Sequence, residues 1–188
     1  MTMDSALIYN PNALDDFIGH SAVEHPLVVQ LGGCDPDRLA EAAALCEQYA
    51  PFHEINLNCG CPSNKAKRAG FGAELMLEPD RVAASLRAMS RRLSRTDLSV
   101  KCRLGVTGRE AWDDLVGFVR CVSDTGVRHL VVHARSCVLK VWVVLMPCLV
   151  VVCLSVASVY AYFPCFRHIY YCLIHSLRLT ALSVFLRV

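Results

Sequence analysis

Four short apolar segments of the sequence each end in side chains that can take part in chemistry. The polar residues at these ends are Gln30, Asn58 with Cys61, Lys101 with Arg103, and His133 with Arg135. A cysteine thiol is mostly protonated at neutral pH and can act as a general acid, while amides, an imidazole and cations can bind a polar or anionic ligand. If the segments are parallel strands, their carboxyl ends meet at one edge. The pattern therefore predicts one pocket lined by these residues.

A basic segment follows the cysteine directly. Lys65, Lys67 and Arg68 lie in the Gly- and Lys-rich stretch between Gly60 and Gly72, which we expect to be a loop. Cations beside a reactive site can bind nucleic-acid phosphates. Ordinary solvated charge explains the same residues equally well, so both interpretations stay open at this point.

The apolar segments alternate with amphipathic stretches of helical length. Strands are expected at 27–31, 54–58, 98–103 and 128–133, with a fifth at Ala6–Tyr9, and helices are expected to start at Asp35-Pro36, at Pro79 and at the capping box Thr107–Glu110. This order predicts βαβ units and a parallel sheet, either doubly wound or closed into a (β/α)8 barrel. Gly32-Gly33 does not form the glycine fingerprint of a dinucleotide-binding sheet, which favours the barrel. A whole barrel takes about 250 residues, so we expect a partial one.

The composition divides the chain into two parts, 1–140 and 141–188. Only three of the 19 Lys and Arg residues, and none of the 17 Asp and Glu residues, lie in the second part. The run 141–163 has no charge and is long enough to span a membrane. A buried core segment and translated non-native sequence, such as an intron or a shifted frame, are the other interpretations.

The cysteines and the start of the chain bear on its location. The 11 cysteines include no Cys-x-x-Cys pair, so we expect no metal site. The first residues lack the pattern of a signal peptide, and together with unpaired thiols this predicts a reducing cytoplasm, with a membrane-associated location as the alternative.

Several blocks of the sequence resemble one family. Ile55–Ser63 (INLNCGCPS) is similar to the N-x-G-C-P-S signature of tRNA-dihydrouridine synthases, and it resembles the A-type subfamily in particular. Further similar blocks follow in the order and spacing of the family: Pro26–Gly33, Phe71–Ala73, Val100–Gly105 and Val132–Arg135.

The resemblance implies an activity, two cofactors and a partner. Members of this family use NADPH to reduce FMN, and the flavin then reduces a uridine of tRNA to 5,6-dihydrouridine. By resemblance, Cys61 is the general acid that protonates C5 of the base. Gln30, Lys101 and His133 match residues that contact the flavin, where a cation near N1 would stabilise the reduced form. Asn58 matches a residue that contacts tRNA, and Arg103, Arg135 and the cations of 65–68 are expected to do the same.

The resemblance also implies missing parts. The chain begins after the first strand of the family's barrel and matches it only through about strands 2–6, so it is expected to be truncated at both ends. Unpaired sheet edges would remain, and the flavin-phosphate loops of the last strands would be absent. We therefore expect the isolated chain to be inactive, and we predict no protein partner. The alternatives are a non-enzymatic membrane-associated or scaffold protein, and another FMN barrel such as a dihydroorotate dehydrogenase.

Overall fold

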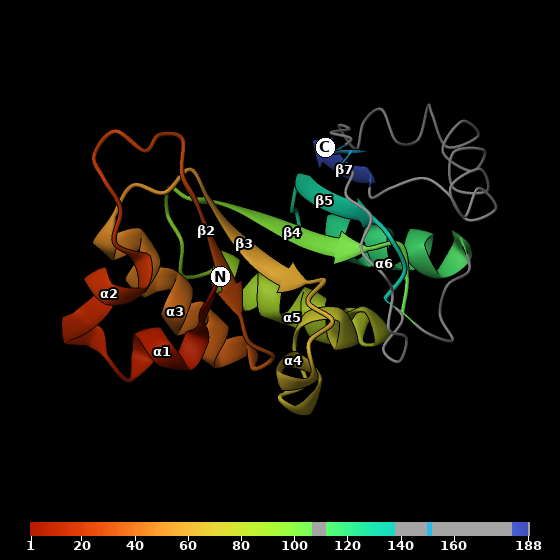
Figure 1. Cartoon of the computed structure of the whole chain (residues 1–188), viewed down its shortest axis with the longest axis horizontal. Helices are drawn as coiled ribbons and strands as arrows, with labels where there is room; N and C mark the ends of the chain where they lie inside the picture. Colours follow the sequence, from red (N-terminus) through yellow and green to blue (C-terminus); the bar gives the residue numbers. More distant parts are fainter. Residues whose placement is uncertain (107–111, 138–149, 152–181, 188) are drawn as a thin grey trace.

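The computed structural model describes residues 1–106, 112–137, 150–151 and 182–187, in which strands alternate with helices (Figure 1). The elements in chain order are β1 (Thr2–Met3), α1 (Asp4–Ile8), η1 (Pro11–Ala13), α2 (Leu14–Ile18), β2 (Val28–Gly32), α3 (Pro36–Tyr49), β3 (Glu54–Cys59), α4 (Asn64–Arg68), η2 (Gly72–Leu77), α5 (Pro79–Ser90), β4 (Asp97–Arg103), α6 (Trp112–Ser123), β5 (His129–Ala134), β6 (Val150–Val151) and β7 (Leu182–Arg187).

The order of the first five strands identifies the architecture. They pair in parallel in the order β1-β2-β3-β4-β5, so that each strand lies beside the next one in the sequence. A doubly wound sheet reverses its strand order at a switch point, whereas a barrel does not. The packing order of the helices is also that of a barrel, because α3 packs between α1 and α5, and α5 packs on α6 (Figure 1). The fold is thus a partial (β/α)8 barrel, as the sequence predicts.

The starts of the long helices follow from local sequence signals. The Asp35 carboxylate accepts hydrogen bonds from the backbone N–H groups of Asp37 and Arg38, at 3.1 and 2.9 Å, and so caps α3. Proline occupies the first position of both α3 and α5, where its missing N–H costs nothing. The capping box predicted at Thr107–Glu110 lies outside the described residues.

Two local predictions were wrong. Ala6–Tyr9 is not a strand, because α1 covers Asp4–Ile8 and the pairing strand is only Thr2–Met3. Within α1, Leu7 is fully buried between two half-buried neighbours, a spacing that suits one turn of helix. The expected loop from Gly60 to Gly72 contains α4, whose first turn is capped by the Ser63 hydroxyl, which accepts from the Ala66 N–H at 3.1 Å.

The C-terminal segment contributes two strands to the sheet. β7 pairs with β5 in antiparallel orientation, and β6 pairs in parallel with β7. The edge of β5 that was expected to be unpaired is therefore occupied. Apart from Val150–Val151, the apolar run 141–163 lies outside the described residues. In the part of the chain that is described, no helix is both long and apolar enough to cross a membrane.

The two faces of the sheet differ in polarity. In β3 the alternate residues Ile55, Leu57 and Cys59 belong to the apolar core that the sheet shares with the helices. The residues between them, Glu54, Asn56 and Asn58, are polar and buried on the opposite face. A barrel encloses this second face, so the chain presents a polar barrel interior.

A buried carboxylate ties the helical layer to the amino end of β4. Glu47 is 7% exposed, and its carboxylate accepts from the backbone N–H groups of Ser94, Arg95 and Thr96 at 2.8–3.2 Å. Burial alone would raise its pKa, but the bonds from these three N–H groups outweigh burial and lower the pKa to about 2.

This site gives a prediction on acid stability. Glu47→Gln should lower the free energy of unfolding at neutral pH by about 1–3 kcal/mol, because charge-assisted bonds are lost. In the wild type this contribution is complete above pH 4.5 and fades as the pH falls toward about 2, because the unfolded chain takes up the proton first. Urea unfolding at several pH values would measure it. A variant that loses stability between pH 4.5 and 2 as steeply as the wild type would contradict the prediction.

Candidate active site at the carboxyl ends of the strands

The thiol predicted to react lies on a turn directly after β3. The Asn58 Oδ1 accepts from the backbone N–H groups of Gly60 and Cys61, at 3.1 and 2.9 Å, and closes the turn. The Cys61 side chain is half-buried, and its thiol donates to the Ser63 hydroxyl at 3.4 Å. The geometry therefore leaves this thiol partly exposed at the carboxyl end of β3 while its backbone is held.

A row of amides continues from this turn across three strands. The Asn58 Nδ2 donates to Gln30 Oε1 at 2.8 Å, and Gln30 Nε2 donates to Asn56 Oδ1 at 2.7 Å. The Asn56 Nδ2 in turn donates to the Ser99 hydroxyl at 2.9 Å. Because the turn offers only N–H donors, Asn58 must present its oxygen there, and this choice fixes the orientation of every amide in the row. In the described part of the chain, the second N–H of Gln30 Nε2 has no partner, so it can donate to a ligand.

Asn56 and Ser99 were missed by the sequence interpretation. Both are buried on the polar face, level with Gln30 in the sheet register. The two-residue spacing of the sequence could have identified them, because residues two apart in a strand lie on the same face of the sheet. Asn56 precedes Asn58 by two residues, and Ser99 precedes Lys101 by two.

A glycine packs against the cysteine from the other side. Gly72 has φ +71°, and a Cβ on it would lie 2.6 Å from the Cys61 carbonyl oxygen and 3.0 Å from Cys61 Cβ. The next residue, Ala73, donates its N–H to the same carbonyl at 3.0 Å. The start of η2 is therefore shaped to receive the cysteine turn.

The predicted cofactor and cationic residues gather beside this turn. Lys101 is level with Asn58, and Arg103 is level with His133. Burial is the main cause that lowers the pKa of His133 to about 4, and the nearby charges of Arg103, Lys101 and Arg135 act in the same direction. The imidazole is therefore neutral at physiological pH. Its Nε2 is buried and has no hydrogen-bond partner among the described residues, so it is available to a water or a ligand.

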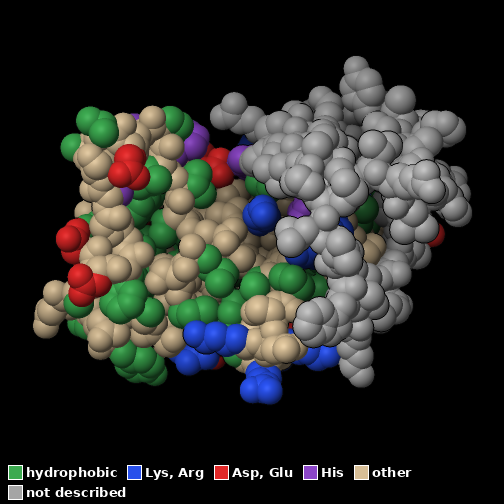
Figure 2. All heavy atoms as spheres, viewed as in Figure 1, with side chains coloured by type: hydrophobic (Ala, Val, Ile, Leu, Met, Phe, Trp, Pro, Cys, Tyr) green, Lys and Arg blue, Asp and Glu red, His purple; other side chains and the backbone are tan. Residues whose placement is uncertain are grey.

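The structure brings most, but not all, of the predicted site residues together. Gln30, Asn58, Cys61, Lys101, Arg103 and His133 share one edge and one face of the sheet. Arg135 is exposed just beyond β5. Lys65, Lys67 and Arg68 are exposed on α4, and Figure 2 shows basic side chains gathered at the lower edge, where Figure 1 places this helix. These three cations form an outer surface next to the turn.

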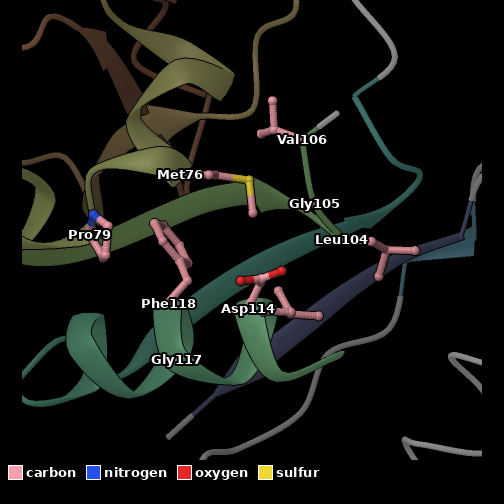
Figure 3. Close-up of a pocket in the computed structure, with 9 residues that line it drawn as sticks. Met76, Pro79, Leu104, Gly105, Val106, Asp114, Gly117 and Phe118 are labelled. Atoms are coloured by element: carbon pink, nitrogen blue, oxygen red, sulfur yellow. The ribbon is translucent and has the colours of Figure 1, made fainter. Parts of the chain in front are cut away.

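A separate cavity lies behind the end of β4, on the side of the helices. It has a volume of about 150 Å³, and Figure 3 shows Met76, Phe118 and Asp114 around it. Met76 also touches the site, because its sulfur accepts from the Arg103 backbone N–H at 3.4 Å. The cavity itself is on the other face of the sheet from the amide row.

Two other cysteines of the sheet are buried on the face opposite the amide row. Cys59 and Cys102 are level in adjacent strands and fully buried. Burial raises the pKa of Cys59 well above its ordinary value and that of Cys102 to about 12, so neither ionises at neutral pH. Within the described residues, no group of three His, Cys, Asp or Glu side chains could hold a metal ion.

Fold and site together define the class of protein: a segment of a (β/α)8 barrel whose strand ends carry a thiol turn, a row of oriented amides and a cluster of cations. Comparison with known proteins gives the family. Residues 1–141 match the family model described as dihydrouridine synthase (Dus). The chain belongs to the dihydrouridine synthase family, whose members are oxidoreductases that modify tRNA.

Individual relatives agree with the family match. A tRNA-dihydrouridine(20/20a) synthase of Xanthomonas axonopodis pv. citri is 44% identical over 140 residues, which is 74% of this chain and 41% of the relative. The synthase of the same name from Xanthomonas campestris pv. campestris is 46% identical over 123 residues, 65% of this chain and 36% of the relative. A third, from Synechocystis sp., is 41% identical over 119 residues, 63% of this chain and 35% of the relative. The chain thus spans about two fifths of the length of these curated relatives.

Proposed function

We propose that this sequence forms part of an enzyme that reduces uridine in tRNA to 5,6-dihydrouridine. The observation that carries the proposal is Cys61, held on the Asn58-capped turn at the end of β3, inside the residues that match the family. The relatives are named as synthases for positions 20 and 20a, and we infer the same target uridines here. A tRNA substrate also implies a cytoplasmic location.

We infer that the cofactor is FMN, reduced by NADPH, because the residues beside the turn suit a flavin. Gln30 has a spare N–H donor, and His133 has a buried nitrogen without a partner in the described chain. Lys101 supplies a positive charge on the same face, which would stabilise the anionic form of a reduced ring. When bound, the flavin would supply the hydride that adds to C6 of the base.

The chain's own residues would carry out the remaining chemistry. Cys61 would give its proton to C5 of the uracil, which completes the reduction of the C5–C6 double bond. The thiolate would then recover a proton from solvent. Because the turn is fixed before the substrate arrives, little ordering is needed to bring sulfur and carbon together.

We propose that the nearby cations hold the RNA. Arg103 and Arg135 lie next to His133 at the pocket, while Lys65, Lys67 and Arg68 lie on the outer surface of α4. Exposed cations bind phosphates by releasing counterions, so each should contribute to a salt-dependent affinity. The Asn58 amide, which already has partners in the turn and in Gln30, has less freedom to contact RNA than the sequence suggested.

A hybrid protein tests the proposed function. Residues 1–140 would replace the aligned 140 residues of the Xanthomonas axonopodis relative, and the hybrid would be expressed in a bacterium that lacks its own synthase for these positions. Nucleoside analysis of the tRNA should detect dihydrouridine at positions 20 and 20a. A folded hybrid that leaves both uridines unmodified would refute the proposal.

The isolated chain is expected to behave differently. Residues 1–188 alone should bind FMN weakly and reduce no tRNA, because they span about two fifths of the relatives' length and cofactor phosphates in such barrels are held by the last strands. Each charge-assisted phosphate bond that is missing would cost about 1.5–3 kcal/mol of binding. A flavin absorbance scan of the purified chain measures this. A yellow protein with stoichiometric FMN would contradict the expectation.

A further inference from the structure

The turn that carries Cys61 is held from two sides. On one side, the Asn58 side-chain oxygen Oδ1 accepts from the backbone N–H groups of Gly60 and Cys61. On the other side, the Arg103 Nε donates to the Gly60 carbonyl oxygen at 2.6 Å. The peptide units around Gly60 are therefore fixed by β3 through one residue and by β4 through another.

The observed register places the Gly60 carbonyl within reach of a side chain from β4. Gly60 lies against the backbone of Lys101 and Cys102, with 3.5 Å between a Cβ placed on Gly60 and either backbone. Arg103 is the next residue of β4 on the polar face, and its guanidinium is partly buried beside the turn. A neutral side chain of similar length would leave the Gly60 carbonyl without this charge-assisted bond.

The partial burial of Arg103 indicates that its charge has a structural role. Desolvation lowers the pKa of Arg103, with an opposing effect of the nearby Cys137 thiol, yet a guanidinium stays charged in proteins. A charge that served only to contact RNA phosphates would gain from an exposed position such as that of Arg135. Keeping it partly buried is favourable only where it forms a strong bond, and among the described residues the side-chain bond observed is the one to the Gly60 carbonyl.

We propose that Arg103 is a positioning residue for Cys61: its bond to the Gly60 carbonyl locks the turn that aims the thiol. The effect of this role on catalysis rests on the proposed function. The bond and its effect on the turn do not depend on that function. Without the bond, the Gly60 peptide can rotate, and the two N–H bonds to Asn58 open together with it. This role is additional to the contact with RNA proposed for Arg103 above, and it makes a separate prediction.

Hydrogen–deuterium exchange of the whole chain tests the proposal without flavin or RNA. The variants are Arg103→Met, which removes charge and donor, and Arg103→Lys, which keeps the charge but removes the Nε. Arg135→Met is the matched control, because it removes a neighbouring cation that forms no hydrogen bond to the turn in the described part of the chain. Mass spectrometry would follow a peptide that spans residues 58–66.

The Gly60 and Cys61 amides should exchange about tenfold faster in both Arg103 variants, as expected for the loss of one charge-assisted hydrogen bond. The control and peptides from α3 should exchange as in the wild type. Unchanged exchange in Arg103→Met, or wild-type exchange in Arg103→Lys, would overturn the proposal. If Arg103→Met does not fold, Arg103→Lys still decides. Because no substrate is present, a failure of this test is distinct from a failure of the proposed function.

Discussion

Replacing Cys61 with alanine in the hybrid protein is expected to slow the reduction of tRNA by about 10²–10⁴-fold, the contribution typical of a general acid. The hydride can still reach the base, but the carbanion that forms at C5 then depends on protons from water. Flavin content should not change, because the residues inferred to contact the ring, Gln30, Lys101 and His133, lie on other strands. The measurements are the rate of dihydrouridine formation and the flavin absorbance of the purified variant.

Cys59→Ala is the matched control for this variant. It removes a second thiol two residues away that is fully buried on the helix side of β3. It should lower stability by about 1 kcal/mol, as for the loss of a small buried group, and leave the rate unchanged. An active Cys61→Ala variant, or one that has lost its flavin, would rule out the role given to this thiol.

Replacing Gly72 with alanine is expected to have the second largest effect. The added Cβ would lie 2.6 Å from the Cys61 carbonyl oxygen, which is backbone and cannot yield without moving the turn. The positive φ adds strain of about 1–3 kcal/mol. A displacement of the thiol by about 1 Å can cost about 10²-fold in rate, so both stability and activity of the hybrid should fall.

Gly70→Ala separates the collision from the strain. Gly70 has φ +68°, close to the +71° of Gly72, but its added Cβ would meet only the Cys34 sulfur at 3.8 Å. Thermal unfolding should therefore show a loss of stability in both variants, larger in Gly72→Ala because the collision adds to the strain, while the rate falls only in Gly72→Ala. Equal rates in the two variants would show that the contact of Gly72 with Cys61 does not matter for the reaction.

Much of this fold follows from short-range signals in the sequence. The Asp35-Pro36 pair placed the start of α3 correctly, and the apolar runs placed β2 to β5 within one or two residues. The strand at Ala6–Tyr9 was misplaced because a single turn of helix and a short strand both show an apolar residue among half-buried ones. The antiparallel pairing of β7 with β5 joins residues about fifty positions apart, and no local sequence pattern predicts it.

The candidate site was predicted less completely than the fold. Residue types at strand ends were enough to select Cys61, Lys101 and His133, because parallel strands bring these ends to one edge. The hydrogen-bond partners of the site residues could not be predicted, because they depend on the register between neighbouring strands. Asn58 was assigned to RNA although its oxygen holds the cysteine turn, and Asn56, which orients Gln30, was not considered.

Flavin reoxidation by tRNA tests whether the residues at these strand ends reduce tRNA. The hybrid would be loaded with FMN, reduced with NADPH under anaerobic conditions, freed of excess NADPH, and mixed with tRNA that lacks dihydrouridine. The absorbance of oxidised flavin should return as dihydrouridine forms in equal amount, and fully modified tRNA should cause no change. A flavin that stays reduced in the presence of unmodified tRNA would show that this site does not carry out the proposed reaction.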